Sequence, residues 1–428
     1  MSQENFKSLN ESSSFYNSFN NEIHTNYNIM KQIFDKNNIC MMLDKIISPS
    51  DYVQKVINTM SNNKNSDLNI RSVIDKKDIN IIDFLIKIGA KIKYISSGTT
   101  GHFFQGSIYD KPNDPKRKKI CSFALKVSGY SKNSNYKSIY ELTRPENAEI
   151  NMLNILSEFV IENKTSHLIL PIQTFYSDIT PFIKMYKENF IKKESDKNGR
   201  YGEFVNRYEK GLIENKVSIL ICELANGGDF LKFVKNNKDK LSALHWNVLL
   251  FQVLSVLCVI QNKYPAFRHN DLKANNLLVE ITDPDYENIK PNKYVNYRIY
   301  NKCYRVPDIG IIIKLWDFDF ACIPKVCENI KVHESWTRRI NITTAKNQYY
   351  DVHYFFRTLI SNSFFPDIIT SKNKKYEDIV KFIYSIMPKD FFKGDKVSRN
   401  GRILVNDEYT TPKIIIETNE YFKNFRIE

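Results

Sequence analysis

The stretch HNDLKANN at residues 269–276 decides how the rest of this sequence is interpreted. It places the carboxylate of Asp271 and the carboxamide of Asn276 in one short segment, between a long apolar run and the apolar residues 277–279. Phosphoryl transfer uses such a pair, because the aspartate orients the acceptor hydroxyl and accepts its proton while the asparagine helps to hold magnesium. So short a match arises by chance often enough that the flanking motifs must decide.

Upstream, a glycine-bearing turn joins two stretches, residues 91–97 and 102–109, that we expect to be β-strands. Glycines in such a turn let the backbone approach phosphates closely and donate N–H groups to them. We therefore assign nucleotide binding to five residues of this turn: Ser96, Gly98, Thr99, Thr100 and Gly101. An ordinary hairpin is the alternative, because glycine turns between strands are common.

A third predicted strand, residues 120–128, carries Lys126 in an apolar setting and on the same face as Ala124. A lysine inside such a strand is costly unless its ammonium group is paired. Glu149, on the amphipathic helix predicted to follow, is the expected partner, and Glu146 is the alternative one turn earlier. The lysine would then bind the α- and β-phosphates of the nucleotide, and the glutamate would hold the lysine in place. Ala124 is also expected to contact the nucleotide.

Two more elements complete the set of groups that phosphoryl transfer uses. The apolar strand predicted at residues 217–223 ends at Glu223, and backbone groups of Glu223 and Ala225 are expected to hydrogen-bond an adenine edge. Asp317 follows another apolar strand and would bind magnesium on the phosphates. Lys273 would neutralise the transferring phosphoryl group.

Taken in order, these motifs resemble the protein-kinase fold over roughly residues 90–360. The resemblance implies an α+β fold with two lobes, an N-lobe of antiparallel β-sheet with one regulatory helix and a mainly helical C-lobe. The expected organisation is an N-terminal extension that is partly disordered (1–85), an N-lobe (86–225) with an insertion (177–216), and a C-lobe (226–428) with an insertion (281–310).

Several positions depart from the usual kinase pattern. Ser96 replaces the first glycine of the loop, Asn270 replaces the arginine before the catalytic aspartate, and Asp319 replaces the glycine after Asp-Phe. No Ala-Pro-Glu precedes the helix that bears Asp351, and only 34 residues separate Asp317 from Asp351, so the activation segment is short. Without the arginine, a phosphate on this segment has no expected partner, so phosphorylation is not expected to switch activity at Thr337, Thr343 or Thr344.

The pairing of DFDF at residues 317–320 with YYDVHYFF at residues 349–356 resembles a narrower group. This group is the virion-associated serine/threonine kinase of poxviruses, poxvirus protein kinase 2, with its relatives in other large cytoplasmic DNA viruses. The resemblance implies ATP, with Mg²⁺ or Mn²⁺, and transfer to serine or threonine of virion proteins. It also implies a location in the virion and the host cytoplasm.

Two other functions stay open. The HNDL and DFD motifs also resemble choline and aminoglycoside kinases, which phosphorylate small molecules. A catalytically inactive scaffold is the third hypothesis, because Asp319 stands where glycine normally permits unusual backbone angles. Inactive relatives usually lose the lysine or a metal ligand, whereas this chain keeps Lys126, Asn276 and Asp317.

Composition limits the remaining classes. The net charge of +14 permits contact with nucleic acid or a membrane surface, but the basic residues are spread along the chain rather than striped. Seven cysteines without a CxxC pair, and no secretory signal, predict a cytosolic protein that is not secreted. Zinc is not expected, because Cys322, Cys327 and His333 lack a fourth ligand. The apolar run 248–260 is too short to span a bilayer.

Overall fold

The chain divides into two compact units, Met1–Ile155 with Leu170–Leu224 and Leu156–Ile169 with Ala225–Glu428. The expected mixed α+β class is confirmed. The computed structural model describes residues 25–45, 48–62, 70–112, 114, 116–132, 136, 138–289, 292–392 and 394–427. The predicted disordered start of the chain lies outside these residues. Helix α6 (Pro145–Ile161) begins in the first unit and ends in the second.

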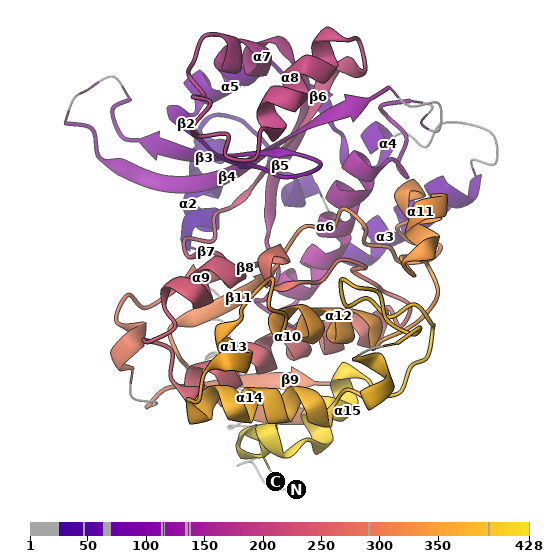
Figure 1. Cartoon of the computed structure of the whole chain (residues 1–428). Coiled ribbons are helices and arrows are strands. Elements are labelled where there is room, and N and C mark those ends of the chain that lie inside the picture. Colours follow the sequence, from indigo (N-terminus) through magenta and orange to yellow (C-terminus); the bar gives the residue numbers. More distant parts are fainter. Residues whose placement is uncertain are drawn as a thin grey trace, which may run out of the picture. The chain divides into compact units, whose positions relative to one another are not determined.

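The first unit is built on a six-stranded sheet with the order β1-β5-β6-β4-β3-β2 (Figure 1). Neighbouring strands in this sheet run antiparallel, except that β1 pairs parallel with β5. Buried and half-buried residues alternate along β3, which explains why the sequence pattern predicted it. The strands are β1 (Lys77–Asp78), β2 (Ala90–Ser97), β3 (His102–Tyr109), β4 (Lys119–Ser131), β5 (Pro171–Asp178) and β6 (Ile213–Glu223).

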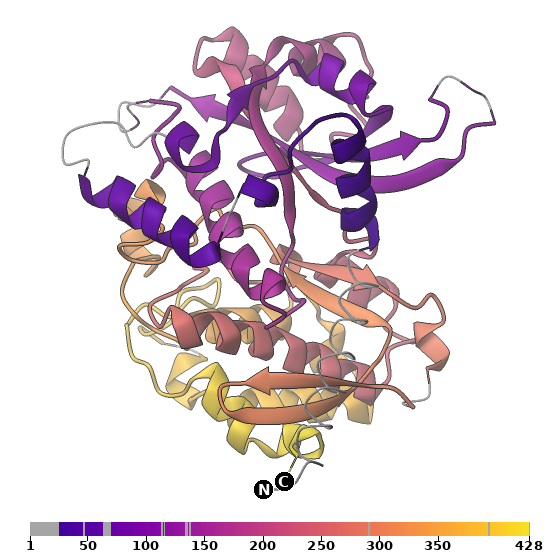
Figure 2. The ribbon, with the colours of Figure 1, turned by 180° about the vertical axis from the view of Figure 1, so that it is seen from behind.

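The first unit holds more helices than the single one expected beside the sheet. Both the N-terminal extension and the 177–216 insertion contribute apolar side chains to the core of the sheet, including Phe34, Phe84, Phe182 and Phe204. Burial of these faces against the sheet explains why both segments fold. In this unit α2 lies beside β4 (Figure 2). The helices are α2 (Thr25–Lys36), η1 (Leu43–Lys45), α3 (Pro49–Asn62), α4 (Ile70–Ile74), α5 (Ile81–Lys87), α7 (Thr180–Lys187) and α8 (Arg200–Glu209).

A buried lysine joins the extension to this sheet. Lys76 is 1% exposed, and its Nζ donates to the Ser218 hydroxyl at 2.6 Å and the Tyr130 hydroxyl at 3.1 Å. It also lies 4.3 Å from the ring centroid of Tyr176. Burial lowers the pKa of Lys76 well below its ordinary value, against a smaller opposing effect of the Glu146 charge. The ammonium group is therefore easily deprotonated in the folded protein.

Replacing this lysine by methionine tests the lowered pKa. Between the folded pKa and about 10.5, the unfolded wild type holds a proton that the folded state lacks. Wild-type stability should therefore gain about 1.4 kcal/mol per pH unit relative to Lys76→Met over that range. Urea unfolding of both proteins at pH 7, 8 and 9 measures the difference. A difference that stays constant with pH would contradict the lowered pKa.

The second unit is organised around α10 (Ala243–Lys263), which starts with a capping box between Ser242 and His245. Helices α14 and α15 pack against it (Figure 1). By length and composition α10 could span a membrane, but 78% of its most apolar window is buried inside the protein. The other helices are α9 (Phe230–Asn236), η2 (Ala274–Asn276), η3 (Tyr286–Asn288), η4 (Ile330–His333), α11 (Ser335–Arg339), α12 (Tyr350–Leu359), α13 (Asp367–Thr370), α14 (Lys374–Ser385), η5 (Lys389–Phe391), α15 (Pro412–Thr418) and η6 (Glu420–Phe425).

Two small sheets complete this unit. One has the order β11-β8-β7 and flanks the predicted catalytic segment, and the other is the hairpin β9–β10. The hairpin lies within the 281–310 insertion, which the sequence pattern predicted only as a polar segment. The strands are β7 (Gly228–Asp229), β8 (Leu277–Ile281), β9 (Tyr294–Ile299), β10 (Lys302–Pro307) and β11 (Ile311–Leu315).

Candidate active site

In the second unit, a buried carboxylate on α12 holds the 269–276 segment. Asp351 is fully buried and accepts hydrogen bonds from the backbone N–H groups of His269 at 2.7 Å and Asn270 at 2.8 Å. These two bonds support the left-handed backbone of Asn270, whose φ is 64°. The His269 imidazole bonds the carbonyl of Trp316 at 2.9 Å through Nε2. The segment is thereby tied to the strand that leads to the predicted metal aspartate.

Both carboxylate oxygens of Asp271 have basic or amide partners. Oδ2 accepts from Lys273 Nζ at 2.8 Å and from Asn276 Nδ2 at 2.9 Å, and Oδ1 contacts Arg402 Nη2. Burial raises the pKa of Asp271, but the charges of Arg402 and Lys273 outweigh this effect and bring the pKa below its ordinary value. Asp271 is therefore ionised and able to accept a hydrogen bond at neutral pH.

The predicted metal residues Asn276 and Asp317 flank the same end of a strand pair. Leu277, directly after Asn276, pairs with Leu315, two residues before Asp317. The Asn276 amide donates through Nδ2 to both the carbonyl and the carboxylate of Asp271, so its Oδ1 is the atom that remains to ligate a cation. Amide and carboxylate oxygens suit Mg²⁺. The donor atoms therefore fit the metal that the kinase resemblance implies.

Asp319, the unusual residue of the Asp-Phe-Asp motif, does not take the strained conformation. The left-handed backbone lies at Asp317, with a φ of 64°, and the φ of Asp319 is not positive. The Asp319 carboxylate contacts Lys331 Nζ, which also lies 4.0 Å from the ring centroid of Phe320. The charge of Asp319 is thus paired within the activation segment. Because its φ is not positive, this position does not require a glycine.

In the first unit, Lys126 and Glu149 form a buried ion pair. The Lys126 Nζ lies 2.6 Å from both carboxylate oxygens of Glu149, and the two side chains are 3% and 4% exposed. The alternative partner, Glu146, instead accepts from Arg144 Nε at 3.1 Å. Ala124 is half-buried two residues before Lys126, on the strand face that the pattern predicted.

The glycine turn lies directly against this lysine. A Cβ added at Gly101 would meet Lys126 Cε at 2.7 Å, so only glycine leaves the lysine in place. The turn closes through a hydrogen bond from the Gly98 N–H to the Gly101 carbonyl at 2.8 Å. Thr99 and Thr100 lie between these glycines, and Ser96 precedes them after a bulge in β2.

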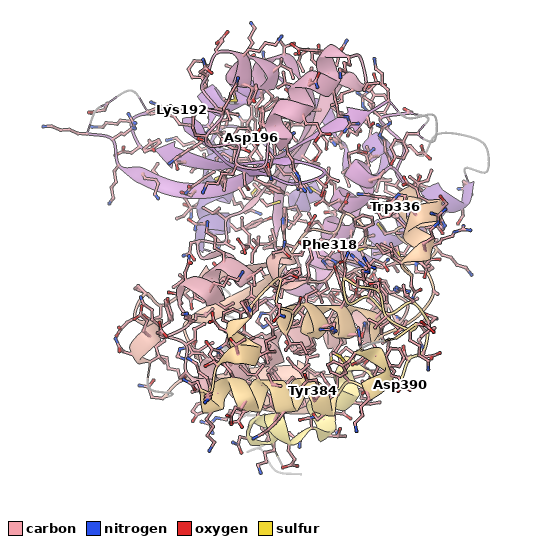
Figure 3. The ribbon with its side chains drawn as sticks, viewed as in Figure 1. Lys192, Asp196, Phe318, Trp336, Tyr384 and Asp390 are labelled. Atoms are coloured by element: carbon pink, nitrogen blue, oxygen red, sulfur yellow. The ribbon has the colours of Figure 1, made fainter. Side chains whose placement is uncertain are left out.

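The 177–216 insertion braces the start of the same turn, which the sequence pattern did not indicate. Asn198 Nδ2 donates to the carbonyl of Ser97 at 2.8 Å, and the Ser97 hydroxyl bonds His102 Nδ1 at 2.7 Å. The His102 ring packs on Tyr201 of α8, and burial lowers the His102 pKa to about 4. Asp196, labelled in Figure 3, accepts from the Tyr201 N–H at 3.1 Å. The insertion is therefore part of the scaffold of the glycine turn.

The predicted hinge residues fall in different units. Glu223 ends β6 in the first unit, where its N–H donates to the carbonyl of Leu170 at 3.0 Å and its Oε1 accepts from the Leu170 N–H. Ala225 opens the second unit, and its carbonyl accepts from the Gly228 N–H at 3.3 Å. The adenine contact of these two residues stays a prediction.

The activation segment is already tied to the catalytic segment by a buried arginine. Arg268 donates to the Thr343 hydroxyl at 3.0 Å and to the carbonyl of Asn341 at 2.5 Å. Thr337 of α11 is fully buried, whereas its neighbour Trp336 is 44% exposed. Trp336 is labelled in Figure 3. These hydrogen bonds tie residues 341 and 343 of the activation segment to Arg268. The absence of a phosphorylation switch stays a prediction.

Comparison with known proteins identifies the family. The family model described as "Poxvirus serine/threonine protein kinase" matches residues 204–393, which include Asp271, Asn276 and Asp317. A protein of Acanthamoeba polyphaga mimivirus named "Putative serine/threonine-protein kinase" is 44% identical over 365 residues, covering 84% of this chain and 75% of its own length. The chain belongs to the poxvirus-type serine/threonine protein kinase family. The family resemblance predicted from the motifs is therefore confirmed.

Two further mimivirus proteins are similar to this chain. Another "Putative serine/threonine-protein kinase" is 32% identical over 142 residues, covering 33% of this chain and 34% of its own. An "Uncharacterized protein" is 22% identical over 385 residues, covering 87% of this chain and 39% of its own length.

Within the described part of the chain, no three His, Cys, Asp or Glu side chains form a group that could hold a metal ion.

Proposed function

We propose that this chain is an ATP-dependent protein kinase that transfers the γ-phosphate to serine or threonine of protein substrates. The observation that carries the proposal is the state of Asp271, which is buried, ionised and hydrogen-bonded to Lys273 and Asn276. Family membership supports the reaction class, and the paired Lys126 and Glu149 of the first unit support nucleotide binding.

In this mechanism, Lys126 binds the α- and β-phosphates and Glu149 keeps its ammonium group in place. Asp271 orients the acceptor hydroxyl and accepts its proton as the bond from the hydroxyl oxygen to phosphorus forms and the bond to the ADP oxygen breaks. Lys273 neutralises charge on the moving phosphoryl group. Mg²⁺, held by Asn276 and Asp317, would offset the negative charge of the phosphates.

The substrates that we propose are virion proteins, phosphorylated during assembly in the cytoplasm of an infected host. The viral origin of the similar proteins supports this setting. The net charge of +14 would favour acceptors with acidic surfaces. Mn²⁺ is expected to replace Mg²⁺ in the reaction, because both metals accept oxygen ligands.

A choice of acceptors tests the proposal. Wild-type protein is incubated with labelled ATP and Mg²⁺ in the presence of casein, myelin basic protein or choline. Label on seryl or threonyl residues of either protein is the expected result. Label on choline alone would assign a small-molecule kinase, and no transfer despite ATP binding would assign a scaffold.

A further inference from the structure

A tight turn near the C-terminal end of the second unit delivers one arginine to the catalytic aspartate. The N–H of Ser398 donates to the carbonyl of Arg402 at 2.8 Å, and the N–H of Arg402 donates to the Ser398 hydroxyl at 3.0 Å. Gly401 takes a φ of 84°, and a Cβ there would meet Arg357 Cγ at 2.5 Å. Only glycine fits this position without strain, so the turn is specifically shaped.

The Arg402 side chain is 8% exposed, and its guanidinium group contacts three polar groups and one aromatic ring. Nη2 contacts Asp271 Oδ1, and Nη1 contacts the carbonyl of Asn270 and the hydroxyl of Tyr350, the latter at 3.1 Å. The guanidinium carbon lies 4.0 Å from the ring centroid of Tyr354. This fork of donors fits one orientation of the catalytic loop, which a lysine could not match.

The acceptor sites of Asp271 show where a substrate hydroxyl can bond. An ionised carboxylate offers about two acceptor sites on each oxygen. Lys273 and Asn276 fill both sites on Oδ2, whereas Arg402 fills one on Oδ1. The remaining site is on Oδ1, beside the arginine. The oxygen that meets the acceptor hydroxyl is therefore the one whose position Arg402 sets.

We propose that Arg402 is a positioning residue that fixes the Asp271 carboxylate with its Oδ1 toward the acceptor hydroxyl. This inference rests on the proposed kinase function. The kinase resemblance gave no role to the chain beyond residue 360, yet the turn that carries Arg402 is part of the catalytic loop's support. The arginine that the usual pattern places at position 270 is absent, and a cation reaches this loop from position 402 instead.

The alternative hypothesis is that the contact between Arg402 and Asp271 inhibits the enzyme. The guanidinium group would then have to leave the catalytic loop before catalysis could begin, and removing it would raise the turnover number. If Arg402 left the loop, the Asn270 carbonyl and the Tyr350 hydroxyl would each lose a buried hydrogen-bond donor. The cation–π contact with Tyr354 would also break, and each loss costs free energy. The number of partners therefore favours a permanent contact over a removable block.

A matched pair of variants, Arg402→Gln and Arg402→Lys, tests the proposal. Glutamine removes the charge while keeping hydrogen-bonding capacity, and lysine keeps the charge while losing the fork. The turnover number and the KM for ATP are measured for both variants, for wild type and for Arg399→Ala. Arg399 is an exposed residue of the same turn and serves as the control.

Arg402→Gln should lower the turnover number about 10- to 100-fold with little change in the KM for ATP. Because lysine keeps the charge but cannot reproduce the fork of donors, Arg402→Lys should recover only part of the lost turnover. Wild-type or higher turnover in Arg402→Gln, or a loss that appears in the KM for ATP rather than in the turnover number, would overturn the inference. Absence of transfer by wild type would instead reject the proposed kinase function, and this inference with it.

Discussion

Asp271→Asn is expected to lower phosphate transfer on the order of 10²- to 10⁴-fold while ATP affinity stays within about 3-fold. Asparagine has nearly the same shape, but its amide is not basic and offers a donor where Asp271 accepts. Lys273 and Asn276 would both lose the acceptor that they share at Oδ2. The loss should therefore fall on turnover rather than on nucleotide binding, which the proposal assigns to Lys126 in the first unit.

The test compares initial transfer rates and ATP dissociation constants of Asp271→Asn and wild type. Asp239→Asn is the matched control, because Asp239 is an exposed aspartate of the same unit. Its transfer rate should equal that of wild type. Turnover of Asp271→Asn within a few-fold of wild type would remove Asp271 from the mechanism, whatever its ATP affinity.

Asp351→Ala should destabilise the second unit by about 2–5 kcal/mol, since it leaves two buried N–H groups without an acceptor. Those N–H groups belong to His269 and Asn270, so the catalytic segment should also shift and transfer should fall. Asp351→Asn keeps one acceptor oxygen and should cost less. Both effects come from the backbone of the catalytic segment, because Asp351 itself is fully buried in α12.

Chemical unfolding and transfer assays on the two variants measure these effects. Asp367→Ala provides the control, because Asp367 is a surface residue of α13 whose ion pair with Lys238 spans 3.6 Å. That variant should change stability by less than about 1 kcal/mol. Equal stability of Asp351→Ala and wild type would show that the two N–H groups find other partners.

The elements that carry regular patterns were predictable from the sequence. The two stretches on either side of the glycine turn predicted β2 and β3, and the long apolar run predicted α10, because each element is marked by its own local sequence. The contact between Lys126 and Glu149 was also predictable, since a lysine inside an apolar strand needs a buried anion nearby. The local sequence was therefore enough to predict a feature when the surroundings of its residues are set by their own element or by the next element along the chain.

The supports of the site were not predictable in the same way. Arg402 reaches Asp271 across 131 residues of sequence, and Asn198 reaches Ser97 across 101. Both lie in polar segments without periodicity, so their partners depend on tertiary structure alone. A signal for Arg402 was nevertheless present, because Gly401 before it marks a turn and the catalytic loop lacks its usual arginine.

The measurement that tests the central claim most directly is transfer of labelled γ-phosphate to casein by wild type, Lys126→Met and Asp317→Asn. Lys119→Met is the control, because Lys119 is an exposed lysine at the start of the same strand as Lys126. The account predicts label on serine or threonine with wild type and Lys119→Met, and a loss on the order of 10²-fold or more in the other two. Equal labelling by all four proteins would contradict it.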